Sequence, residues 1–169
     1  MATITTAPAA RARSFAPDTF ERILAGGAIL LSAAVIVALA RGRAHWAEVP
    51  WAVWAHLATI MLALALTPTM LLRPRGDRWH RLLGRVWAVS MIATALLSFA
   101  LHPANARFSV IHILSVWTLL QVPVIWWSAR RHNIVRHRRA VRGMVLGALL
   151  IAGFFTFPFG RLLGSWLFA

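Results

Sequence analysis

Long apolar runs constrain this chain more than any other feature. Several uninterrupted stretches approach 20 residues, the length that an α-helix needs to cross a hydrocarbon core of roughly 30 Å. Hydrophobic residues make up 60% of the chain and charged residues 13%, about half the charged share of a soluble domain. Because open sheets leave backbone groups unpaired in lipid, the sequence predicts an all-α integral membrane protein.

The apolar runs predict a bundle of about five transmembrane helices in a single domain, residues 20–169, after a disordered tail at residues 1–19. The expected spans cover about 23–40, 51–72, 80–101, 108–128 and 140 to the C-terminus. A cleaved signal peptide is the alternative for the first run, which is long for a signal. Asp18 or Thr19 is expected to cap the first helix, with Glu21 or Arg22 in its opening turn.

Three prolines bear on these spans. Pro68 lies inside the second span and Pro123 inside the fourth, and each predicts a kink because proline removes a helix hydrogen bond. The fifth span is overlong and is interrupted by Pro158 and Arg161. The sequence therefore leaves the form of the C-terminal part open.

The basic residues predict how the chain sits in its membrane. All eighteen are arginines, and the net charge is +14. With the N-terminus inside, the cytoplasmic segments hold three, five and six arginines, and the other side holds two, one and one. This bias predicts a multi-pass protein of the bacterial inner (cytoplasmic) membrane with a cytoplasmic N-terminus. It favours anionic lipid head groups, and not nucleic acid, as the partner of the charge.

Several kinds of chemistry are excluded by composition and motif. The chain has no cysteine, so it forms no disulfide, iron–sulfur cluster, thiolate-ligated haem or covalently attached haem. It also lacks a glycine-rich phosphate loop, a pair of acids within a span and a Ser-His-Asp order. Hydrolysis and ATP use have no support.

Four of the expected spans carry one histidine each, at matched depths. His56 and His112 lie near the outer ends of the second and fourth spans, and His80 and His137 lie at the inner ends of the third and fifth. Ionisable residues in a membrane are costly and indicate function. The two pairs predict two centres, each a haem b iron held by imidazoles from facing helices. The alternatives are hydrogen bonding between helices for the outer pair and an ordinary interfacial position for the inner pair.

Arginines beside these histidines are candidates to hold haem propionates, because a guanidinium pairs with a carboxylate through two hydrogen bonds. The candidates are Arg81, Arg85, Arg138 and Arg142 at the inner level and Arg161 at the outer level. The alternatives are that the clusters serve as topology signals and that Arg161 reaches toward lipid head groups.

Three segments resemble a bacterial family of predicted polytopic membrane proteins of unknown function: HRLLGRVW at 80–87, VIHILSV at 110–116 and HRRAVRGM at 137–144. The resemblance covers most of residues 50–165 and implies topology more than chemistry. The order of the histidines is also similar to the transmembrane cytochrome b family that moves electrons from ascorbate. That similarity implies one haem at His56 and His112 and another at His80 and His137. It is a match of arrangement and not of sequence.

The sequence thus predicts a transmembrane electron carrier, a membrane oxidoreductase of the b-type cytochrome class with one or two haems. Its expected redox partner is a quinone or another protein. The alternative is a cofactor-free accessory or assembly subunit of a larger membrane complex. A small-solute or metal transporter is a third hypothesis, weakened by the lack of a repeated half and of an acid within a span.

Overall fold

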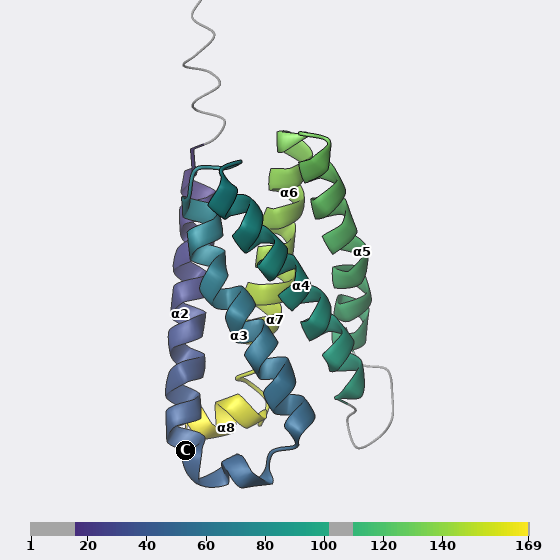
Figure 1. Ribbon diagram of the computed structural model, residues 1–169. Helices are drawn as coiled ribbons and strands as arrows, with labels where there is room; N and C mark the ends of the chain where they lie inside the picture. The colour runs from purple at the N-terminus through teal and green to yellow at the C-terminus, as the bar shows by residue number, and fades with distance from the viewer. Residues whose placement is uncertain (1–15, 102–109, 169) are drawn as a thin grey trace, which may run out of the picture.

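The computed structural model describes residues 16–101 and 110–168, and every regular element in these ranges is helical (Figure 1). The elements are α2 (Thr19–Arg41), η1 (Gly42–Glu48), α3 (Trp51–Leu72), α4 (Arg78–Ala100), α5 (Val110–Arg130), α6 (Ile134–Met144), η2 (Val145–Ile151), α7 (Ala152–Phe154) and α8 (Leu162–Phe168). The segments α6, η2 and α7 follow one another without a break, so they act as one rod whose middle is a π-helix.

The five long rods form a bundle in which successive helices are neighbours. α3 packs on α2 and α4, α5 packs on α4, and the last rod packs on α5 and returns to α2 (Figure 1). The main apolar core lies between them and comprises Leu24, Ala25, Ala28, Ala63, Leu64, Leu71, Trp87, Ala88, Met91, Val122, Ile125, Met144, Val145 and Leu149. Inside it, the Trp87 indole N–H donates to Thr67 Oγ1 at 3.0 Å.

Apolar side chains also cover the outside of the bundle. Leu30, Val89 and Ile113 are each more than 60% exposed. Three described helical segments are long and apolar enough to cross a membrane, namely Thr19–Glu48, Trp51–Leu72 and Arg78–Ala100. They correspond to the first three expected spans, and their apolar perimeter is consistent with a membrane protein.

The starts of several helices follow local signals. Asp18 caps α2, as predicted: its carboxylate accepts from the Glu21 backbone N–H, and the Glu21 side chain accepts from the Asp18 N–H. Pro68 lies within α3 and Pro123 within α5. The expected tail (up to residue 15) and the start of the fourth span at Phe108 lie outside the described residues.

The C-terminal part differs most from the predicted single span. The last rod ends at Phe154, and α8 folds back against α2 and η1 at the end of the bundle opposite the N-terminus (Figure 1). The reason is local, because a proline ring clashes with the carbonyl four residues earlier, and Pro158 is four residues after Phe154. Phe159 and Gly160 then turn the chain with φ angles of 65° and 67°.

Candidate functional site

One of the two predicted histidine pairs comes together. The rings of His80 on α4 and His137 on α6 have centroids 6.4 Å apart and planes at 72°. Asp77 positions the first of them, since its carboxylate caps α4 by accepting from the His80 backbone N–H at 2.6 Å. Both rings are partly buried. The pair lies at the end of the bundle that contains Asp18. We name this end of the bundle the arginine end.

The hydrogen bonds of this pair leave ring nitrogens available. His137 Nδ1 lies 3.1 Å from the carbonyl oxygen of Ile125 on α5. A carbonyl only accepts, so Nδ1 carries the proton in this contact and Nε2 of the neutral ring keeps its lone pair. In metal-bound histidines, the ring nitrogen that does not bind the metal commonly donates its N–H to such an acceptor. His80 Nδ1 is buried, and it has no hydrogen-bond partner among the described residues.

The other predicted pair is divided between two sides of α4. From α3, His56 Nδ1 lies 3.1 Å from the Thr94 carbonyl oxygen. From α5, the buried ring of His112 lies 5.7 Å from the ring of Phe99, measured between centroids. Since α4 lies between α3 and α5 (Figure 1), His56 and His112 approach α4 from two different helices.

The arginine end contains a buried carboxylate that the sequence interpretation did not single out. The Glu21 side chain is 1% exposed and pairs with Arg75, Arg138 and Arg142. Arg138 donates from Nε to Oε1 at 3.1 Å and from Nη2 to Oε2 at 3.0 Å, and Arg142 donates from Nε to Oε1 at 3.2 Å. Paired hydrogen bonds of this kind are among the stronger ones in proteins.

Asp18 joins the same cluster, accepting from Arg138 at 3.2 Å and also from Arg142. Burial raises the pKa of its carboxyl, but the hydrogen bonds from the Glu21 backbone and from Arg142 outweigh that effect and lower the pKa. We name these five residues the carboxylate cluster. The cluster connects three parts of the chain: the start of α2, the loop that precedes α4, and α6. The capping-box spacing of Asp18 and Glu21 was its only signal in the sequence.

The arginines predicted to hold propionates have other surroundings. Arg138 and Arg142 bind the carboxylates of α2. Arg81 donates to the Gly76 carbonyl oxygen at 2.7 Å. Arg85 and Arg161 are exposed, the latter in the turn before α8. The two interior arginines of the set are thus engaged by the protein itself.

Ring spacing and packing bear on whether His80 and His137 could hold one iron. With metal–nitrogen bonds of about 2 Å, two imidazoles that bound one iron would have centroids on the order of 6 Å apart, close to the 6.4 Å between these two rings. The two rings meet at the seam between α4 and α6. Deeper on the His80 face of α4, however, Trp87 and Met91 are buried in the core. A haem would enter only with a shift of α6 against α4.

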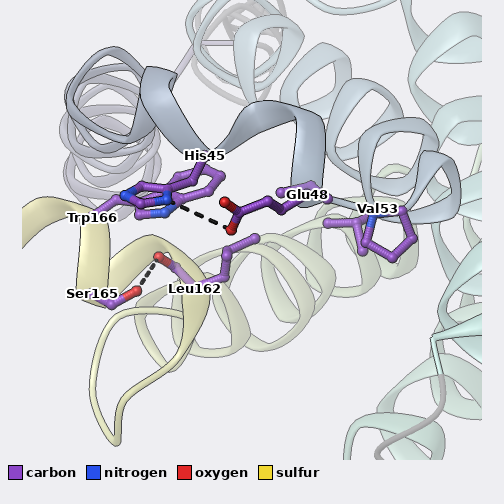
Figure 2. A pocket seen from close by; sticks show the side chains of 8 residues that line it. His45, Glu48, Val53, Leu162, Ser165 and Trp166 are labelled. Carbon is purple, nitrogen blue, oxygen red and sulfur yellow. Dashed lines mark hydrogen bonds and ion pairs between the residues drawn. The ribbon is translucent and has the colours of Figure 1, made fainter.

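Two open surface hollows lie in the described ranges, and neither is lined by these histidines. The larger, about 460 Å³, lies between η1 and α8 at the opposite end, where His45 Nδ1 and a Glu48 carboxylate oxygen are 3.6 Å apart beside Trp166 (Figure 2). The smaller, about 290 Å³, lies between α5 and α6. No group of three or more acid or histidine side chains suited to a metal ion occurs within residues 16–101 and 110–168.

Comparison with protein-family models, with curated proteins and with solved structures finds no match for this chain.

Proposed function

We propose that this protein is a membrane-embedded electron carrier in which His80 and His137 hold the iron of a single haem b. The observation that carries the proposal is the approach of the two rings, 6.4 Å between centroids, with a buried Nδ1 on His80 that finds no hydrogen-bond partner in the described part of the chain. A bound haem would supply one-electron chemistry. The sequence-based proposal of two haems is thereby reduced to one, at the arginine end.

The surrounding residues have defined tasks in this proposal. The Ile125 carbonyl fixes the proton of His137 on Nδ1, which directs Nε2 toward the iron. Asp77 fixes the first turn of α4 and so the position of His80. We place the bundle in the bacterial inner membrane with five spans and the arginine end in the cytoplasm, where the arginine bias favours it. A quinone or a redox protein would exchange the electron.

The filled core favours a second function. Trp87 and Met91 are buried close to the seam, and Arg138 and Arg142 already pair with Asp18 and Glu21. This is what a cofactor-free accessory or assembly subunit would show. Such a subunit would dock to a larger membrane complex through its exposed apolar and tryptophan side chains.

An oxidised-minus-reduced absorption spectrum decides between the two functions. We expect protein made with ample haem to show a b-type signal that His80→Ala and His137→Ala each abolish. His56→Ala and His112→Ala serve as matched controls, which should keep the signal. Size-exclusion profiles would verify that the variants remain folded.

Partial loss of the signal in all four variants would restore the two-haem proposal. A colourless wild-type protein would remove the electron carrier and leave the accessory subunit.

A further inference from the structure

The smaller hollow is an open groove between α5 and α6. Its α5 wall carries residues at helical positions i, i+4 and i+7, and its α6 wall carries a matching stripe. The lining residues are Trp117, Gln121 and Val124 on α5 and Arg136, Arg139, Ala140 and Gly143 on α6. The two helices run side by side here (Figure 1).

The charged part of the groove lies toward the arginine end. Arg136 and Arg139 are both exposed, and no carboxylate in the described part of the chain pairs with either. Their neighbours Arg138 and Arg142 differ, because they turn to the other side of α6 and bind Glu21 and Asp18. Two arginines of α6 therefore form ion pairs within the protein, and two others of the same helix line the groove.

The rest of the groove is mainly apolar and leads away from the charges. Gly143 lies one turn below Arg139, and a Cβ added there would meet no atom within 4 Å. Trp117 and Val124 form the facing wall, with Gln121 between them. The absence of a side chain at Gly143 leaves room for a chain-like ligand along α6.

We propose that this groove binds one anionic phospholipid, with its phosphate at Arg136 and Arg139 and an acyl chain along Trp117, Val124 and Gly143. The charge complementarity explains the phosphate, and the apolar side chains of Trp117 and Val124 explain why the occupant is a lipid and not free phosphate. The proposal rests on the membrane placement given above, but not on the haem. A colourless protein would leave it intact.

The test counts bound lipid by native mass spectrometry of the full chain in detergent, titrated with phosphatidylglycerol or phosphatidylcholine. We expect one phosphatidylglycerol to be retained selectively. The double variant Arg136→Gln/Arg139→Gln should weaken its binding about 30-fold, at roughly 5-fold per arginine. The matched control is Arg130→Gln/Arg131→Gln, which removes equal charge from arginines that lie over Trp126 and Trp127 outside the groove. It should change binding less than about 2-fold.

A second variant tests the apolar part without changing charge. Gly143→Leu fills the open space and should reduce phosphatidylglycerol binding about 10-fold. In a separate competition experiment, glycerol phosphate should not displace phosphatidylglycerol from the protein. Equal loss in both double variants would overturn the site in favour of general attraction to the charged surface. Competition by glycerol phosphate at concentrations matching the lipid would overturn the lipid as occupant.

Discussion

The two ends of the bundle are closed by different forces. At the arginine end, the carboxylate cluster ties α2 to α6 and to the loop before α4 through charge-assisted hydrogen bonds around a buried Glu21. At the opposite end, α8 closes against α2 and η1 by apolar packing of Val35, Ala38, Phe157, Leu163 and Trp166. The comparison shows that ion pairs dominate at one end, whereas apolar packing dominates at the other, where one hydrogen bond from Arg41 Nη1 to the Leu167 carbonyl oxygen (2.7 Å) is added.

The largest expected effect comes from removing the buried charge. Glu21→Gln keeps the size of the side chain but leaves three arginines facing an uncharged amide. Breaking a buried ion pair by removing one partner costs about 3–5 kcal/mol. We expect a loss of that order in the free energy of unfolding, measured by denaturant titration in detergent.

Glu48→Gln provides the control at the opposite end. Glu48 is an exposed acid whose partner, His45, is also exposed, so the change should stay within about 0.5 kcal/mol. Equal effects of the two substitutions would show that charge does not distinguish the two ends.

The next effect concerns shape at the opposite end. A Cβ on Gly42 would overlap the indole of Trp166, so Gly42→Ala should cost about 1–3 kcal/mol through overpacking. Gly143→Ala is the matched control, because its Cβ meets open space and alanine favours a helix by about 0.5–1 kcal/mol. Thermal unfolding of both variants measures the difference. A neutral Gly42→Ala would mean that α8 is not held by close contact.

The smallest effect is the pH dependence of an exposed ion pair at the arginine end. The hydrogen bond from the Arg73 side chain, followed by that from the His80 backbone, lowers the pKa of Asp77. A lowered pKa in the folded state contributes stability above the unfolded value, near pH 4, and the contribution is lost as the pH falls through the folded value.

Asp77→Asn keeps a cap for α4 but removes this contribution. We expect the unfolding midpoint of the variant to fall less steeply below about pH 4 than that of the wild-type protein. Midpoints measured from pH 5 to pH 3 would reveal this. Parallel curves would exclude Asp77 as a source of the acid sensitivity.

Features that depend only on residues close together in the sequence could be predicted without the structure. The second expected span, 51–72, has the bounds of α3, and the third, 80–101, differs from α4 by two residues at its start and one at its end. The Asp18 cap also follows from spacing along the chain. Hydrophobic run length and capping are local properties, so no tertiary information was needed.

The histidine pairs show where this reasoning stops. Counting residues along each helix predicted two equivalent histidine pairs, and of these pairs the described structure brings the rings of His80 and His137 into contact with each other. His56 and His112 are at matched depths but contact α4 from different sides. Depth follows from the number of residues along a helix, whereas the direction of a side chain around the bundle depends on helix order and rotation.

The sequence by itself determined that this chain is helical and where its charges gather. It predicted five membrane spans, and three described segments are long and apolar enough to cross a membrane. These properties follow from backbone hydrogen bonding and hydrophobicity, which act within a segment. Only the tertiary structure decided that Arg138 and Arg142 bind Glu21 while Arg136 and Arg139 line a groove. Residues three or four apart share a face of one helix, and which neighbour each face meets is fixed only when the helices pack.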